Sequence, residues 1–557
     1  MDALDRESSA EAVVAYHERT KHHFQRFAAS LGYLDWATQP DPFRRYAGTE
    51  LVRLPLPGPR RHIRYWQLYA EGAIAPEPLS LASLSAFFRY SLSLTAWKRA
   101  GSSMWSLRAN PSSGNLHPTE GYAVVPALEA LGDAPAVYHY APREHALERR
   151  AVMSDEVWQG LGVNLPEHSF LAGLSSVLWR EAWKYGERAF RYCQHDVGHA
   201  LAALRLAAAA LGWRLLLLDG VEDEVVASIL GLDRAVDFEG AEEEEPDLLA
   251  LVVTAPVSPL AGGRTRLGRW PRSGDGIRWF GRANALSREH GVSWPVIDEV
   301  AQATRRASTR LTATELSGLP RSGDLFTAPV RESRLSADEA ILGRRSALAM
   351  DGQTSMAFST FCLMLARLIP TEDQQAVPWD ALPWYPRIHL GLFVHRVDGL
   401  TPGLYALVRH PSALPSLKGI MRPAFRWERV SGAPPGLPLY LLIEGDLRRL
   451  AARVSCGQDI AGDGAFSLGM IADYMDSLHA YGAAFYRNLF WEAGMVGQVL
   501  YLEAEEAGIR STGIGCYFDD PVHDVFGIDT REWQSFYHFT VGAPVEDTRL
   551  TTLPAYR

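Results

Sequence analysis

The chain has 557 residues, of which 47% are hydrophobic and 22% are charged, and its formal net charge is −10. This size and composition are typical of a globular protein of roughly two to four domains. The acidic balance argues against a general nucleic-acid or anionic-membrane binder. The four cysteines form no CxxC pair, which argues against a zinc ribbon or a disulfide framework and favours a reducing, cytoplasmic compartment.

The N-terminal segment is charged throughout and lacks the apolar core of a signal peptide. We interpret residues 1–80 as an extension ahead of the first domain. The longest apolar stretch, residues 201–218, contains Arg205 and Arg214 and is interrupted by Gly212. It therefore predicts a buried helix followed by a strand and no membrane span.

A dense run of turn-forming residues, NPSSGNLHP, occupies positions 110–118 and stops just before an apolar stretch. Serine, asparagine, histidine and proline surround a single glycine there. A loop cap would account for the run by itself. Its unusual polarity instead suggests that the turn holds a ligand, with His117 as a structural member.

Residues 184–233 and 480–529 align without a gap at an offset of 296. Both segments predict a long helix ended by glycine, a short strand, and a short helix closed by Gly-x-Asp. The chain is therefore predicted to contain two copies of one α+β domain. The aligned pairs include Arg191 with Arg487, Gly198 with Gly494, Gly212 with Gly508, Asp223 with Asp519, and Gly231 with Gly527.

The long helix of each copy is apolar on nearly every side, so we expect it to be buried between the copies in a pseudo-dimer. The segment after the first copy is rich in Gly, Arg and Trp and predicts an extended linker, with a helical piece near 294–306. The acidic run at 242–245 predicts a solvated loop. The expected organisation is an N-terminal extension (1–80), domain 1 (81–257), a linker (258–335) and domain 2 (336–557).

Three further motifs accompany the serine-rich turn. They are RRS at 344–346, interpreted as a helix start that suits an anion, WKYGERAFRY at 183–192, and GIGCYFDD at 513–520. Together these motifs resemble the FMN-dependent nitroreductase superfamily, in particular its SagB/ThcOx-type, azoline dehydrogenase-like branch. The resemblance covers most of 80–257 and 337–550. It implies α+β domains, each with a central mixed or antiparallel sheet flanked by helices, and FMN in the interface between them.

The resemblance also implies which residues hold FMN. One partner of the family dimer supplies a Pro-Ser-Ser-x-Asn turn, and the other supplies Arg-x-Ser, a glycine-rich strand end and a basic C-terminal segment. The turn residues here are Pro111, Ser112, Ser113, Gly114 and Asn115. The residues from the second copy are Arg344, Arg345, Ser346, Gly513, Ile514, Gly515 and Arg549.

The two copies have diverged in a complementary way. The second copy has WDALPWYP at 379–386 in place of the turn, and the first copy has LLDG at 217–220 in place of GIGC. We therefore expect one FMN per chain. Leu348 stands where the family often has a further basic residue. Either another arginine replaces that contact with the phosphate, or the affinity for phosphate is reduced.

The resemblance implies that Lys184 and Tyr185 form the base pair that removes a proton as hydride leaves for flavin N5. An interface salt bridge with a packed ring is the alternative. The second copy has Ala480 at the lysine position. His195 and His199 have the spacing of a metal pair, but they align with Trp491 and Met495, so we expect core residues and no metal. Cys516 is expected to be a buried strand residue.

The resulting hypothesis is an FMN-dependent oxidoreductase that oxidises a heterocyclic or peptide-derived substrate. An NAD(P)H-dependent nitro or quinone reductase is one alternative. Another is a catalytically decayed scaffold or peptide-binding partner in a biosynthetic complex. The substrate, the electron donor or acceptor, the direction of reaction and any oligomerisation beyond the intramolecular pseudo-dimer are left open.

Overall fold

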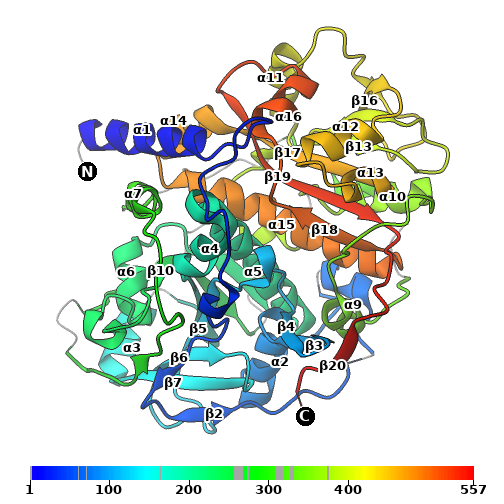
Figure 1. The fold of residues 1–557 in the computed structure, drawn as a ribbon. Helices are drawn as coiled ribbons and strands as arrows, with labels where there is room; N and C mark the ends of the chain where they lie inside the picture. The colour runs from blue at the N-terminus through cyan, green and yellow to red at the C-terminus, as the bar shows by residue number, and fades with distance from the viewer. Residues whose placement is uncertain are drawn as a thin grey trace.

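The computed structural model describes residues 3–60, 62–70, 72–163, 165–255, 267–271, 275–307, 318–326, 332–372 and 376–556. Within these ranges the chain folds into two α+β halves that pack against each other, with the N-terminal segment running along the front of both (Figure 1). None of the described helices is long and apolar enough to cross a membrane.

Each half is built around one antiparallel sheet. The first sheet has the order β11-β7-β6-β5-β8-β10-β9, and the second has the order β15-β16-β14-β13-β17-β19-β18. The first comprises β5 (Thr119–Val125), β6 (Ala136–Ala141), β7 (Ala146–Met153), β8 (Ser169–Ser176), β9 (Arg214–Leu217), β10 (Glu245–Val253) and β11 (Ile277–Trp279). The second comprises β13 (Ile388–Val394), β14 (Gly403–Leu407), β15 (Glu428–Arg429), β16 (Leu439–Glu444), β17 (Phe466–Asp473), β18 (Arg510–Ile514) and β19 (Trp533–Gly542). The matching order confirms the predicted pair of like α+β domains.

Two long helices, α5 (Ala189–Ala210) and α15 (Phe485–Glu506), form the centre of the interface. They cross at the aligned glycines: a Cβ on Gly494 would lie 2.9 Å from the Cα of Gly198. Glycine is needed there because any side chain would push the helices apart. Nearly every residue of both helices is buried, as predicted for helices enclosed between the two copies.

Exchanged ion pairs show that the halves are related by a pseudo-two-fold axis. Arg191 of the first half donates to Asp519 of the second at 2.9 Å. The aligned Arg487 donates back to Asp223 at 2.6 Å. The aspartates begin α6 (Asp223–Leu230) and α16 (Asp519–Phe526), and both helices end in left-handed glycines, as the repeat predicts.

The C-terminus returns to the first half. Strand β20 (Thr551–Pro554) pairs with β3 (Leu94–Ala100), which pairs in turn with β4 (Ser103–Arg108). Figure 1 shows the red C-terminal strand beside these blue strands. The sequence did not predict this exchange.

The segment predicted as a linker contributes strands to the first half. Residues Ile277–Trp279 pair with β7, and β12 (Arg282–Ala283) pairs with β1 (Tyr46–Ala47) of the N-terminal extension. Strand β2 (Leu51–Arg53) also joins β7. Residues 256–266, 272–274, 308–317 and 327–331 of this region lie outside the described residues.

The acidic run at 242–245 is not a solvated loop, contrary to the sequence-based expectation. The side chain of Glu244 is fully buried and accepts hydrogen bonds from Arg44, Tyr46 and Tyr122. These partners lie 122 to 200 residues away, so local charge density could not reveal them.

The other helices flank the sheets and the interface. They are α1 (Ala3–Arg19), α2 (Leu81–Ser91), α3 (Asp155–Gly162), α4 (Leu178–Tyr185), α7 (Pro295–Ala303), α8 (Ser322–Leu325), α9 (Ala337–Gly343), α10 (Phe358–Ala366), α11 (Leu414–Ile420), α12 (Arg448–Val454), α13 (Ile460–Asp463) and α14 (Tyr474–Tyr481). Helix α7 is the helical piece predicted near 294–306.

Candidate functional site

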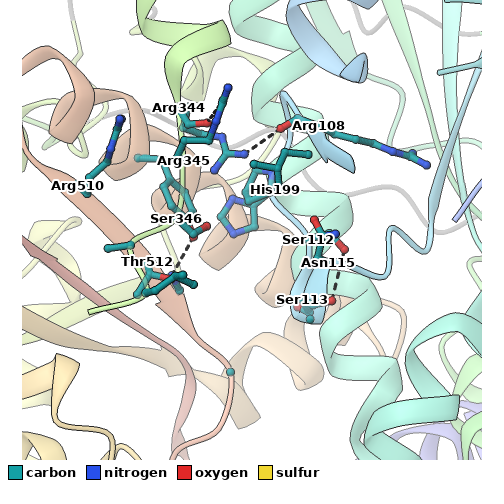
Figure 2. Close-up of a pocket in the computed structure, with 18 of the residues that line it drawn as sticks. Arg108, Ser112, Ser113, Asn115, His199, Arg344, Arg345, Ser346, Arg510 and Thr512 are labelled. Atoms are coloured by element: carbon teal, nitrogen blue, oxygen red, sulfur yellow. Dashed lines mark hydrogen bonds between the residues drawn. The ribbon is translucent and has the colours of Figure 1, made fainter. Parts of the chain in front are cut away.

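A cavity of about 760 Å³ lies between the two halves, beside the crossing of α5 and α15. The first half contributes residues 110–115 and His117, part of β3 and β4, and one side of α5. The second half contributes residues 343–348, Tyr501, most of β18 with the two residues after it, and the C-terminal segment. Figure 2 shows the serine-rich turn on one side and an arginine cluster on the other, with His199 between them.

The serine-rich turn is held in an unusual backbone shape by its own side chains. Gly114, Asn115 and His117 all have positive φ angles, of 58°, 59° and 54°. Asparagine tolerates this region better than most residues, and glycine adopts it freely. The Ser112 hydroxyl accepts the His117 amide at 2.8 Å, and the Asn115 amide group donates to the Ser106 carbonyl at 3.0 Å. The polar residues therefore shape the turn.

Asp196 of α5 anchors the same turn from below. Its carboxylate accepts the backbone amide and the hydroxyl of Ser113, both at 3.0 Å. Burial raises the pKa of Asp196 to about 7, although the hydrogen bonds from Ser112 and Ser113 favour the charged form. The serine-rich turn is thus tied to α5 beside the cavity.

Basic side chains from the second half gather opposite the turn. Buried Arg344 donates through Nε to the Ala109 carbonyl and through one terminal nitrogen to the Arg108 carbonyl, both at 2.9 Å. Its other terminal nitrogen, Nη1, is buried without a hydrogen-bond partner among the described residues. Arg345 and Arg510 line the cavity beside it. Burial, and then the neighbouring Arg344 charge, lowers the pKa of Arg345 to about 10.

The RRS segment does not start a helix, contrary to the sequence-based interpretation. Helix α9 begins with a capping box between Ser336 and Glu339 and ends at Gly343, so Arg344 follows its last turn. Ser346 instead forms a parallel bridge with Ser511 beside β18. The Ser-x-x-Glu pattern at 336–339 was the local signal for the true helix start.

The glycine-rich strand end forms the wall next to Ser346. A Cβ on Gly513 would lie 1.9 Å from the Tyr537 hydroxyl, and one on Gly515 would lie 2.3 Å from the Tyr192 ring. Only glycine fits at either position without displacing an aromatic ring. The Tyr501 hydroxyl joins the wall by accepting the Gly513 amide at 3.0 Å and bonding the Ser346 hydroxyl at 2.9 Å. Ile514 between the glycines also lines the cavity.

Lys184 and Tyr185 lie at the C-terminal end of α4, against the turn. A Cβ on Gly114 would lie 2.6 Å from the Tyr185 hydroxyl and 3.1 Å from the Lys184 Nζ. The Lys184 ammonium also lies 5.2 Å from the Tyr185 ring centroid. Tyr185 is among the residues that line the cavity, and Lys184 is not. Burial, followed by the charge of Glu181, raises the pKa of Tyr185 well above its ordinary value, so its hydroxyl stays protonated.

Most predicted cofactor residues meet at this cavity, and one does not. Pro111, Ser112, Ser113, Gly114, Asn115, Arg344, Arg345, Ser346, Gly513, Ile514 and Gly515 all line it. Arg549 does not: its side chain is 86% exposed and pairs with Asp547 at 2.8 Å.

The structure adds residues that the motifs did not single out. Arg510 of β18 supplies a further guanidinium in the wall, while Leu348, at the position of the missing basic residue, is 70% exposed. His199 lines the cavity and bonds the Tyr537 hydroxyl at 3.2 Å, although its alignment with Met495 predicted only a core residue. Arg510 lies three residues before Gly513, so its proximity to that motif was the available signal.

The pseudo-symmetry-related position is almost filled. The segment 379–386 contributes Trp379, Asp380 and Trp384 to a pocket of about 80 Å³. Glu492, which the repeat aligns with Asp196, accepts the Trp384 indole N–H and pairs with buried Arg409. The divergence of the two copies thus coincides with one open and one nearly closed interface position.

Comparison with known proteins finds similarity to one family in both halves of the chain. The nitroreductase family model matches residues 76–240 and 438–543. One matched segment lies in each half of the chain. A structure from Anabaena variabilis, named as a nitroreductase, superposes with a TM-score of 0.69 at 24% sequence identity. The superposition covers 96% of this chain and 99% of the Anabaena chain, so the two-domain fold is shared over nearly the whole length.

Two sequence relatives are similar over shorter stretches. The trifolitoxin-processing protein TfxB of Rhizobium leguminosarum bv. trifolii is 32% identical over 176 residues, which are 30% of this chain and 47% of TfxB. MJ1384 of Methanocaldococcus jannaschii, named as a nitroreductase, is 30% identical over 126 residues, which are 22% of this chain and 62% of MJ1384. The chain thus spans less than two thirds of the length of either relative.

Proposed function

We propose that the chain is an FMN-dependent oxidoreductase that binds one FMN in the interface cavity. The observation that carries this proposal is the way the cavity is divided between the halves. The polar turn comes from the first half, and the arginines and the glycine-rich strand end come from the second. This is the division of roles that the resemblance to the SagB/ThcOx-type branch implies.

The residues present suit a flavin mononucleotide. The phosphate is a dianion, and Arg344 has an unpartnered buried nitrogen, with Arg345 and Arg510 nearby. Gly513 and Gly515 leave backbone exposed where any side chain would collide with a tyrosine. The basic cluster would hold the phosphate, and the turn at 111–115 would lie along the ring. When bound, FMN would supply a hydride-accepting centre at N5.

In this proposal Lys184 and Tyr185 act as a proton-transfer pair. The neutral Lys184 Nζ would take up the proton that leaves the substrate, and the Tyr185 hydroxyl oxygen would orient the lysine by accepting a hydrogen bond from one of its N–H groups. Asp196 would hold the turn in place by fixing Ser113.

For the substrate we propose a heterocycle or another peptide-derived compound. The supporting observation is the similarity to TfxB, a protein named for processing trifolitoxin. The size of the cavity leaves room for a second molecule or side chain beside a bound ring system.

The stoichiometry of bound flavin tests the proposal. Purified protein supplemented with FMN should release close to one FMN per chain on heating, measured by flavin absorbance against protein concentration. Folded, colourless protein would overturn the proposal and favour the non-catalytic scaffold. Two FMN per chain would contradict the closed state of the second position.

A further inference from the structure

A pair of thiols lies at the edge of the same cavity and has no part in the proposed flavin chemistry. Cys516 lines the cavity directly after Gly515, and Cys456 follows the end of α12. Gln458, two residues after Cys456, bonds the Cys516 carbonyl, so the two cysteine-bearing segments touch, and the Cys456 side chain and His22 of the N-terminal extension both lower the pKa of Cys516. Both cysteines are partly exposed, whereas Cys193 and Cys362 are buried.

The hydrogen bonds of His22 determine which ring nitrogen faces the sulfur. Its Nδ1 accepts the Ala28 amide at 2.9 Å, so Nδ1 carries no proton. The proton of the neutral ring is therefore on Nε2, which is the nitrogen left to donate to the Cys516 sulfur. The His22 backbone amide donates to Asp519 at 2.9 Å, which fixes the ring beside the end of β18. Burial lowers the pKa of His22 and keeps the ring in this neutral form.

The backbone around Cys456 is also specialised. Cys456 has a φ of 55°, a left-handed conformation that is uncommon for a residue with a side chain. Gln458 donates from Nε2 to the Ser455 carbonyl at 2.8 Å and to the Cys516 carbonyl at 2.9 Å. One amide group thus ties the two cysteine-bearing segments together.

We propose that Cys516 and Cys456 form a hydroperoxide-reactive thiol pair that closes into a reversible disulfide in the wall of the cavity. In the first step the Cys516 thiolate attacks the terminal oxygen of the hydroperoxide. The O–O bond breaks, and the products are a Cys516 sulfenic acid and a hydroxide or alkoxide ion, which takes a proton from water. In the second step the Cys456 sulfur attacks the Cys516 sulfur, the S–O bond breaks, and water leaves with the Cys456 proton. The two thiols lose two electrons, and the hydroperoxide gains them.

The charges around Cys516 favour its reactive form. The Cys456 side chain, followed by His22 and the charge of Arg188, lowers the pKa of Cys516, against the effect of burial. Tyr185 and Tyr192 also face the sulfur, and burial keeps both hydroxyls neutral. In the proposed reaction Cys516 is the nucleophile, while Cys456, whose pKa is raised by its neighbour Cys516, is the thiol that resolves the sulfenic acid.

The pair is defined by protein groups alone, so this inference does not depend on flavin binding. Reduced full-length protein is treated with a small excess of hydrogen peroxide at pH 7, blocked with N-ethylmaleimide under denaturing conditions, and examined by intact and peptide mass spectrometry. The expected product lacks two hydrogens, contains the Cys456–Cys516 disulfide, and returns to the reduced mass with dithiothreitol.

Two variants separate the roles of the thiols. Cys456→Ser should stop at a Cys516 sulfenic acid that dimedone traps, and Cys362→Ser should form the disulfide as the parent does. Oxidation of buried Cys193 or Cys362 as fast as Cys516 would overturn the proposal, as would the absence of the disulfide in the parent protein.

The alkylation rate of Cys516 tests its activation separately. At pH 6, iodoacetamide should modify Cys516 about tenfold more slowly in His22→Gln than in the parent, since each unit of pKa changes the thiolate fraction about tenfold. Unfolding curves of the two proteins should match. Equal rates in two folded proteins would overturn the assignment of His22.

Discussion

The two interface positions related by the pseudo-two-fold axis share one backbone plan and differ in what their carboxylates bind. At the open position, Asp196 accepts only backbone and hydroxyl donors of the serine-rich turn. At the closed position, the aligned Glu492 accepts backbone amides of Arg387 and Ile388 and pairs with Arg409. Both carboxylates therefore bind a neighbouring segment to an interface helix, but only Glu492 also pairs with a buried arginine, Arg409.

A second aligned pair shows the same divergence. Tyr501 of α15 lines the open cavity, whereas Arg205, its counterpart on α5, pairs with Asp380 at 2.7 Å in the closed position. Tryptophan rings fill the remaining space there. When two copies are joined in one chain, each interface position can change independently, and here one was filled while the other kept its cavity.

The largest effect is expected from Lys184, which has no counterpart in the second copy. Under the proposed function, Lys184→Ala should slow flavin reduction by substrate about 10²–10⁴-fold, the usual contribution of a general base. Dithionite needs no base and should reduce the variant normally in rapid-mixing experiments. Tyr185→Phe should show a milder loss, and Tyr481→Phe, its counterpart in the second copy, should show none. If Lys184→Ala instead loses FMN, Lys184 has a structural role in the interface and no catalytic one.

The free energy of unfolding should depend strongly on the Glu492–Arg409 ion pair at the closed position. Glu492→Gln leaves the Arg409 guanidinium fully buried without a carboxylate, which typically costs about 3–5 kcal/mol of unfolding free energy. The matched change Asp196→Asn should cost less, because no buried cation loses its partner. Urea unfolding of both variants at one pH makes the comparison. Equal losses would mean that the two carboxylates have the same role.

Phosphate binding should depend on the second half. Arg344→Ala should remove a charge-assisted contact worth about 1.5–3 kcal/mol and weaken FMN binding about ten- to a hundredfold, measured by flavin fluorescence titration. The control is Arg89→Ala in the first half. Arg89 donates to Ser93 and lies 5.4 Å from the Tyr556 ring, so FMN affinity should be almost unaltered. If Arg89→Ala weakened FMN binding and Arg344→Ala did not, the phosphate site would belong to the first half.

A further comparison concerns the pH dependence of stability at the open position. The folded-state pKa of Asp196 is about 7, above its unfolded value, so its contribution to stability is full at low pH and is lost as the pH rises towards 7. Asp196→Asn should remove this decline. The difference in unfolding free energy between the two proteins should change by at most about 1.4 kcal/mol per pH unit. A difference that does not vary between pH 4 and 7 would contradict the raised pKa.

The sequence alone was sufficient for the repeat, the fold class and most of the cavity wall. Helix ends at glycine, the turn at 110–118 and the buried long helices are local or periodic properties, so they can be read along the chain. The offset of 296 aligned Arg191 with Arg487 and Asp223 with Asp519, and the structure then showed that these residues form the exchanged ion pairs Arg191–Asp519 and Arg487–Asp223.

Only the tertiary structure decided which distant groups share a site. Arg510 lines the cavity and Arg549 lies outside it, because the wall is formed by the path of β18 and not by charge near the C-terminus. Glu244 is buried because the N-terminal extension folds back over it. Cys456, Cys516 and His22 meet from three separate segments, and no spacing along the chain encodes that contact. Packing between remote segments, and not local pattern, determined these arrangements.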